Sequence, residues 1–176
     1  KVSKKQAFHL KAKFLSLAKK LKLKLKIVLT DGSQPIGNGI GPVLEIKDVL
    51  AVLRRENSPQ DLENKAVKLS GLILEMIGKA KKGKGEKKAL EILNSGHAYK
   101  KFEEIIKAQK GKISYLKQAR YIHNIVSLKT GTVKKIENKP INYTARLAGC
   151  PIDKAAGVYL HKHKGDKVKI VSGNDK

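Results

Sequence analysis

The first thirty residues carry two different spacings of apolar side chains. Over residues 3–24 apolar residues recur every three or four positions with lysines between them, which predicts an amphipathic helix with Ser3 as its N-cap. Within residues 21–27 leucine and lysine alternate strictly, and this period of two predicts a change from helix to strand. The strand is predicted over residues 25–30, where β-branched side chains appear.

A glycine-rich loop over residues 31–42 joins this strand to a helix predicted over 43–55. Its glycines stand at alternate positions, Gly37, Gly39 and Gly41. A glycine-rich turn from strand to helix presents backbone N–H groups to anions, although the loop lacks the Gly-Lys-Ser/Thr of a P-loop. Two interpretations stay open: the loop holds phosphate, with Ser33 and Gln34 as its best polar ligands, or its glycines permit a tight backbone crossing. We favour the crossing.

Three further helices are predicted before residue 112. The run Ser58-Pro59-Gln60-Asp61 is typical of a helix start, with Ser58 as the cap and Asp61 completing a capping box. This helix is predicted to end near Ile77, with Gly78 as its stop. A basic connector over 79–85 leads to two shorter helices, 86–94 and 97–109, each followed by a glycine.

The pattern changes after about residue 112. Short β-rich runs occupy 121–127, 131–136, 158–163 and 168–171, with a turn at 165–166 and one helix over 142–148. The order of elements predicts an α/β fold class, or α+β for a fragment. We expect two units: residues 1–112 as part of a mixed-sheet α/β domain, and residues 113–176 as a small, truncated β-rich domain.

The net charge of +24 raises the question of a nucleic-acid partner. Only four of the 39 basic residues are arginine, and the lysines are spread along every segment. This distribution favours solvated faces over an evolved binding stripe, because arginine is the better residue for bidentate phosphate contacts. A basic nucleic-acid-binding module is kept as the alternative function, and nonspecific polyanion binding as a property of either.

Cysteine content and hydropathy indicate the cellular compartment in which the protein is expected. The single cysteine, Cys150, excludes an internal disulfide framework. No run approaches the ~18 apolar residues of a membrane span, and the first residues lack a signal-peptide core. We therefore expect a reduced, cytoplasmic protein with no membrane partner.

Few other residues are candidates for metal binding or catalysis. His161 and His163 share one face of a predicted strand, but no third ligand with suitable spacing is visible, so no metal is expected. Cys150 has no nearby acid or histidine to activate it. Glu45 could orient a loop N–H or complement the dipole of its helix, and we favour the dipole.

Several segments, read in order, resemble the C-terminal part of the thymidine/AMP phosphorylase family, most of all its archaeal-type thymidine phosphorylases. The resemblance covers most of the chain in family order. The segments that carry it are Ser33–Gly37, Gly41–Glu45, Gly71–Gly78, Glu91–Gly96, Lys101–Gln109 and Ala155–Leu160 with Gly165–Val168.

The resemblance implies a glycosyltransferase of pyrimidine metabolism. In such an enzyme phosphate attacks the anomeric carbon of a nucleoside, the base departs, and pentose 1-phosphate remains. It implies phosphate as co-substrate, no cofactor or metal, a homodimer for the full-length protein, and an α/β domain followed by a small β-rich C-terminal domain.

The resemblance also implies that some functional elements of the family lie outside the segments that this chain matches. The family's phosphate loop, base-binding helix and proton-donating acid lie N-terminal to the matched segments, so no catalytic residue is assigned and the chain is expected to be inactive alone. One ligand-contacting lysine of the family falls on Lys1. With the loop residues it completes the predicted substrate- and phosphate-binding set: Lys1, Ser33, Gln34, Gly37 and Gly39. Which nucleoside is used stays open.

Overall fold

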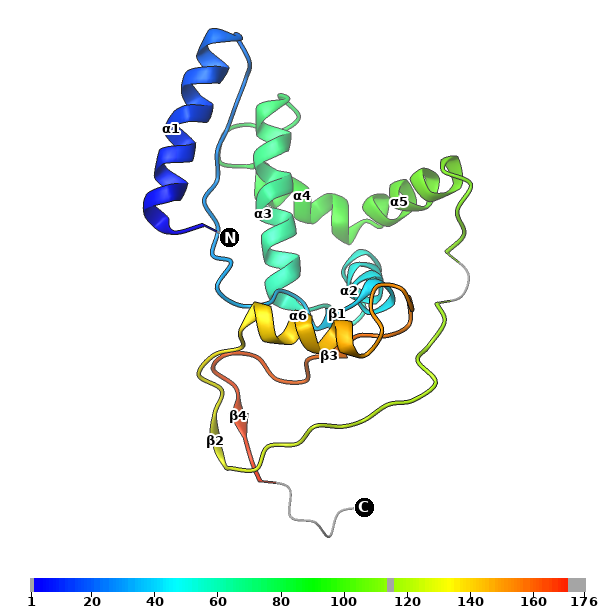
Figure 1. The fold of residues 1–176 in the computed structure, drawn as a ribbon. Helices are drawn as coiled ribbons and strands as arrows, with labels where there is room; N and C mark the ends of the chain where they lie inside the picture. Colours follow the sequence, from blue (N-terminus) through cyan, green and yellow to red (C-terminus); the bar gives the residue numbers. More distant parts are fainter. Residues whose placement is uncertain (1, 114–115, 171–176) are drawn as a thin grey trace.

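A computed structural model describes residues 2–113 and 116–170 (Figure 1). Helices and short antiparallel strands are mixed, which confirms the α/β class in its broad sense. The division into residues 1–112 and 113–176 stays a prediction. The described elements are α1 (Lys4–Lys20), β1 (Gly39–Ile40), α2 (Pro42–Arg54), α3 (Gln60–Met76), α4 (Gly85–Asn94), α5 (His97–Ala108), β2 (Gly131–Thr132), α6 (Asn138–Leu147), β3 (Val158–Tyr159) and β4 (Lys167–Val168).

Most predicted helices form close to where the sequence places them. At the start of α1, Ser3 Oγ accepts a hydrogen bond from the Gln6 backbone N–H, and Gln6 Oε1 accepts one from the Ser3 N–H. The Ser3 cap is thus confirmed as a reciprocal capping box. Gly78 and Gly96 adopt φ of 73° and 76°, the left-handed conformation expected of a glycine beside a helix end.

The predicted capping box of α3 is wrong. This helix begins at Gln60 after Pro59, and no side chain caps its first turn. Ser58 Oγ instead donates to Glu63 Oε2 at 2.5 Å, and the Asp61 carboxylate accepts from the N–H of Gly37. Ser58 therefore contacts a side chain of the next helical turn and Asp61 makes a tertiary contact, so neither caps the helix start as the local rule predicts.

The structure differs from the sequence predictions mainly in the strands. Residues 25–30 and 121–127 are extended but belong to no strand in the described chain. The predictions 131–136 and 158–163 shorten to two-residue strands. The prediction 168–171, whose last residue lies outside the described residues, corresponds to a strand over Lys167–Val168. β1 pairs with β3 (Gly39 opposite Tyr159), and β2 pairs with β4 (Gly131 opposite Val168). A ladder exists only where a partner strand lies alongside, and local alternation does not supply that partner. Helix α6 also begins four residues earlier than the predicted residue 142.

The packed part of the molecule centres on the later helices. α3 and α4 lie against each other, and α5 contacts both α4 and α2 (Figure 1). The buried apolar side chains are Leu50 and Val52 on α2, Ala89 and Leu93 on α4, Ala18, Ala145, Ala155 and Ala156. α1 stands at the edge of the molecule (Figure 1). None of the described helices has the length and hydropathy to cross a membrane.

Candidate functional site

Backbone N–H groups of the glycine-rich loop point at carboxylates of the chain itself. Asp48, in the middle of α2, is only 6% exposed. Its Oδ2 accepts hydrogen bonds from the N–H groups of Asn38 at 2.6 Å and Gly39 at 2.8 Å. The negative charge that the phosphate-holding interpretation places beside this loop is therefore supplied by an aspartate of the next helix.

Two more carboxylates complete this arrangement. The two Oδ atoms of Asp61 lie 3.1 and 3.3 Å from the Gly37 nitrogen, and Glu45 Oε1 accepts from the Gly41 N–H at 3.1 Å. The dipole interpretation of Glu45 is thus incomplete, because its side chain also orients a loop N–H. Glu45 and Asp48 fix the loop to α2, and Asp61 fixes it to the start of α3.

The alternate glycines have little room for a side chain. A Cβ on Gly37 would lie 2.7 Å from Asp48 Oδ2, and one on Gly39 would lie 2.5 Å from the backbone of Leu44. At Gly41 the nearest atom would be the carbonyl oxygen of Ala156, also at 2.5 Å. Gly37 and Gly41 further adopt φ of 72° and 132°, which disfavour other residues. This geometry supports the tight-crossing interpretation of the loop.

Ser33 and Gln34, the polar candidates, contact other parts of the chain. Ser33 donates from its N–H and its Oγ to the carboxylate of Asp31, at 2.8 and 2.9 Å. Gln34 Oε1 accepts from the Ile136 N–H at 2.7 Å, and Asn138 Nδ2 donates to the Gly32 carbonyl at 2.9 Å. The first half of the loop is therefore joined to the segment that leads into α6.

An open hollow of about 460 Å³ lies between this part of the loop and α3. Gln34 borders it, whereas Ser33, Gly37 and Gly39 do not. Lys1 lies outside the described residues. Two of the residues that line the hollow, Lys65 and Lys68 of α3, are positively charged. The full lining is Leu29, Thr30, Asp31, Gln34, Pro35, Ile36, Asp61, Asn64, Lys65 and Lys68.

Asn38 is the site residue that the sequence reasoning missed. Its Nδ2 donates to the hydroxyl of Tyr159 at 3.2 Å, its Oδ1 lies 2.8 Å from His163 Nε2, and its carbonyl accepts from the Leu160 N–H at 2.7 Å. These three partners lie more than 120 positions away, so no local signal marks them. The only hint is the place of Asn38 between two glycines.

The histidine pair does not converge on a common point. His163 meets Asn38, while the ring of His161 packs edge-on against Tyr159 at 4.9 Å between centroids. Across residues 2–113 and 116–170 no three histidine, cysteine or acidic side chains are grouped to hold a metal ion.

An ion pair between exposed Arg55 and buried Glu63 stabilises the chain just before α3. Arg55 Nη1 lies 2.6 Å from Glu63 Oε2, and Glu63 is 6% exposed. The hydrogen bond from Arg55, helped by that from Ser58, lowers the pKa of Glu63 below its ordinary value, against the opposing effect of burial. The pair is structural, since neither residue borders the hollow beside Gln34.

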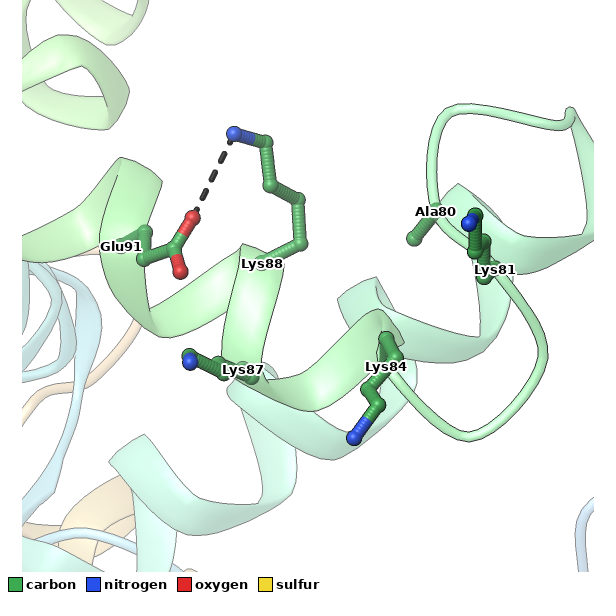
Figure 2. Close-up of a pocket in the computed structure, with 6 residues that line it drawn as sticks. All are labelled: Ala80, Lys81, Lys84, Lys87, Lys88 and Glu91. Carbon is green, nitrogen blue, oxygen red and sulfur yellow. Dashed lines mark hydrogen bonds and ion pairs between the residues drawn. The ribbon is translucent and has the colours of Figure 1, made fainter.

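A second hollow, of about 290 Å³, lies on the lysine-rich side of α4 (Figure 2). Its lining is Ala80, Lys81, Lys84, Lys87, Lys88 and Glu91. The ion pair of Lys88 with Glu91, at 3.4 Å, is drawn in Figure 2; no salt bridge within the described chain involves the other three lysines. This surface is positively charged and open to solvent.

Comparison with known proteins gives several relatives of high similarity. A "Putative thymidine phosphorylase" of Legionella pneumophila (strain Corby) is 43% identical over 164 residues, which are 93% of this chain and 32% of that protein. One of Chelativorans sp. (strain BNC1) is 43% identical over 92% of this chain and 32% of its own length. An "AMP phosphorylase" of Methanococcus aeolicus is 44% identical over 93% and 33%.

These relatives confirm the resemblance stated from the sequence. The chain spans about one third of the length of the curated relatives that it matches. No protein-family model matches it.

Proposed function

We propose that this chain, a homologue of thymidine and AMP phosphorylases over nine-tenths of its length, is the C-terminal part of a thymidine-type nucleoside phosphorylase. One observation carries the proposal: identity of 42–44% extends over 93% of the chain, far beyond any single motif. In this role the chain completes an α/β domain and contributes the β-rich part that closes on the substrate.

The reaction proposed is phosphorolysis. A phosphate oxygen forms a bond to C1′ of the nucleoside while the C1′–N bond to the base breaks. The base leaves with the bonding electron pair and takes up a proton from hydrogen phosphate or water, and pentose 1-phosphate is the second product. For this reaction the protein must place cationic groups and N–H groups around the phosphate, and it must orient the two reactants.

The loop geometry supports a positioning role within this enzyme. The N–H groups of Gly37 and Gly39 already have carboxylate acceptors, and Ser33 already donates to Asp31. We therefore assign Ser33, Gly37 and Gly39 to holding the loop in place. Gln34 borders the hollow beside Lys65 and Lys68, and its Nε2, which donates one hydrogen bond to the Ser33 carbonyl at 3.0 Å, has a second N–H, so we keep Gln34 as the candidate for contact with phosphate. We expect the isolated chain to be inactive, because the resemblance places the family's phosphate loop and base-binding helix N-terminal to the segments that this chain matches.

A chimera tests this proposal. The matched 164 residues of the Legionella pneumophila (strain Corby) relative are replaced by this chain, and phosphate-dependent release of base is measured with thymidine, uridine and AMP. We expect base release by the chimera and none by the isolated chain. The unmodified relative is the control. A folded chimera that releases no base from any of the three substrates would overturn the proposal.

A second candidate function, nucleic-acid binding, is favoured by the lysine-lined hollow and the net charge of +24. Its test is the salt dependence of binding to duplex and single-stranded oligonucleotides of different sequence. We expect affinity to fall equally for all of them as salt rises, which marks nonspecific phosphate contacts. A sequence preference that survives at 200 mM salt would favour the second candidate over the first.

A further inference from the structure

Lysines are concentrated on one turn and on the helix that follows it. Six of the ten residues from 79 to 88 are lysine, against 35 of 176 in the whole chain (39 basic residues less four arginines). Residues 79–91 also contain two acids, Glu86 and Glu91, so this stretch carries a net charge of +4, six lysines less two acids. All six lysines are exposed. We call residues 79–91 the lysine surface.

The backbone beneath these lysines is held in place by the chain itself. The Lys79 N–H donates to the Leu74 carbonyl at 2.8 Å. Glu75 Oε1 accepts from the N–H groups of Gly83 and Gly85, at 2.9 and 3.1 Å. Because these glycine N–H groups are occupied, the attraction of this surface for anions comes from its lysine side chains.

Little negative charge within the chain neutralises these lysines. Lys88 Nζ lies 3.4 Å from Glu91 Oε2. Within the described residues, the other five lysines of this surface take part in no salt bridge. Five positive charges on an ordered backbone are therefore available to a partner outside the chain.

The ammonium groups of the lysine surface do not converge on one point. Lys84, Lys87 and Lys88 are spaced three and four positions apart, which places their Cβ atoms about 5–6 Å from one another. Their side chains nevertheless extend in different directions around the open hollow of about 290 Å³ (Figure 2). A compact anion needs donors that meet around it, whereas a long polyanion contacts such ammonium groups one after another. The geometry therefore suits a long polyanion.

The residue types of this surface suit contact with phosphate groups and not with bases. Residues 79–91 contain no aromatic side chain and no arginine. Binding of single strands relies on bases stacked on aromatic side chains, and the commonest base-specific contact is that of arginine with guanine. A lysine ammonium binds phosphate as a point charge. A duplex presents a phosphate charge about every 1.7 Å along its axis, so several fall within reach of this surface.

We propose that the lysine surface binds the phosphate backbone of a nucleic-acid duplex irrespective of its base sequence. The inference goes beyond the proposed phosphorolysis and does not depend on it, because no residue of the lysine surface borders the hollow beside Gln34. It assigns to one turn and one helix the polyanion binding that the composition alone leaves without a location.

A membrane and an acidic protein are less favourable partners. A helix that binds a membrane surface inserts its apolar side chains. On α4, Ala89 and Leu93 are buried in the protein, and Leu90 is 38% exposed. The carboxylates of an acidic protein are bound best by the two-pronged guanidinium of arginine, which this surface lacks.

Two variants of the whole chain test the inference, each with four exposed lysines replaced by glutamine. The surface variant changes Lys81, Lys82, Lys84 and Lys87. The control variant removes the same charge elsewhere, at Lys117, Lys129, Lys139 and Lys154, which likewise form no salt bridge in the described chain. Binding to a labelled duplex of about 16 base pairs, the size of a typical protein-bound site, is measured by fluorescence anisotropy over a range of salt concentrations.

We expect the surface variant to bind the duplex at least tenfold more weakly than the parent, and the control variant to stay within about threefold of it. Each phosphate contact contributes about 0.9 to the slope of log affinity against log salt. The slope should therefore become less negative by about 3 in the surface variant and by less than about 1 in the control. Equal thermal midpoints of the parent and both variants show that all three fold.

Acetylation of lysines in the unmodified chain tests the same contact without any substitution. The rate at each lysine is followed by mass spectrometry with and without the duplex. We expect Lys81, Lys84 and Lys87 to react at least threefold more slowly when the duplex is bound, and Lys129 and Lys154 to react at unchanged rates.

Several results would overturn the inference. They are equal losses of affinity in the two variants, acetylation that the duplex slows equally at all lysines, or tighter binding of a single strand than of the duplex. Tighter binding of poly-glutamate, of vesicles containing phosphatidylserine or of inorganic tripolyphosphate, at equal anionic charge, would identify an acidic protein, a membrane or a compact anion as the partner instead.

The proposed function is tested apart from this inference by placing the four surface substitutions in the chimera described above. We expect phosphate-dependent base release to be unchanged by them. Loss of base release would place the lysine surface in the phosphorylase reaction and overturn the inference. An unsubstituted chimera that releases no base, with duplex binding still lost in the surface variant, would overturn the proposed function and leave the inference standing.

Discussion

At the scale of single residues, several acidic side chains of this basic protein accept hydrogen bonds from the backbone. The chain has 39 lysines and arginines for 15 acids, yet Glu45, Asp48, Asp61 and Glu75 all accept hydrogen bonds from backbone N–H groups. At each of these places the chain turns sharply and its N–H groups lack a helix or sheet partner. A charged acceptor there satisfies donors that would otherwise be buried without one.

Asp48 gives the sharpest test of this role. Its replacement by alanine leaves the N–H groups of Asn38 and Gly39 without their acceptor, so we expect Asp48→Ala to lower the free energy of unfolding by about 2–3 kcal/mol. Asp48→Asn keeps a neutral acceptor and is expected to cost about half as much. Urea denaturation measures both, with the exposed Glu86→Ala as the control, expected within about 0.5 kcal/mol of the parent. A cost for Asp48→Ala no larger than the control's would contradict this role.

Glu63 makes stability depend on pH. Its pKa is lowered in the folded chain, chiefly by the hydrogen bond from Arg55, so acid protonates the unfolded chain first. The contribution is therefore complete above the ordinary glutamate pKa of about 4.3 and is lost as the pH falls through the lower folded value. We expect Glu63→Gln to be less stable than the parent by about 1–2 kcal/mol at pH 7, and the difference to shrink as the pH falls below the ordinary glutamate pKa, by urea denaturation. A difference that stays constant with pH would show that the charge of Glu63 is unimportant.

At the scale of elements, α3 and α4 cross where each has a glycine. A Cβ on Gly85 would lie 2.1 Å from the Gly71 carbonyl oxygen, and one on Gly71 would lie 2.5 Å from the Glu86 nitrogen. We expect Gly71→Ala and Gly85→Ala each to cost about 1–3 kcal/mol, because the helices must separate to admit the methyl group. The matched control is Gly131→Ala, where no atom lies within 4 Å of the added Cβ. Thermal unfolding of the three variants compares them, and equal midpoints would contradict the close crossing.

The helices could be predicted from the sequence because their determinants are local. The Ser3 cap, the apolar spacing of α2 and the stop at Gly96 all lie within a few residues of the element that they define. The strands could not, because β1 meets β3 across about 120 residues, and the alternation in residues 23–30 carries no information about a partner. The same limit applies to the site: Glu45 could be related to the loop from its position, whereas the contact of Asn38 with His163 could not.

At the scale of the whole molecule, a high positive charge and an uncovered apolar surface oppose each other. Repulsion between chains of net charge +24 keeps them apart at low salt, while Phe14, Leu17 and their neighbours on α1 favour association. Salt screens the repulsion, since the Debye length falls from about 10 Å at 0.1 M to about 3 Å at 1 M, and leaves apolar association in place.

We therefore expect the isolated chain to be monomeric in 50 mM NaCl and to associate in 500 mM NaCl, as measured by light scattering after size exclusion. A double variant with Phe14→Lys and Leu17→Lys reduces the apolar surface of α1 and is expected to stay monomeric at both salt concentrations. A matched variant with Lys13→Ala and Lys20→Ala keeps the apolar side chains and lowers the charge, so it should associate at lower salt than the parent. If the parent chain remains monomeric at 500 mM NaCl over a tenfold range of concentration, the exposed side chains of α1 are not an adhesive surface, and repulsion is not what keeps this chain in solution.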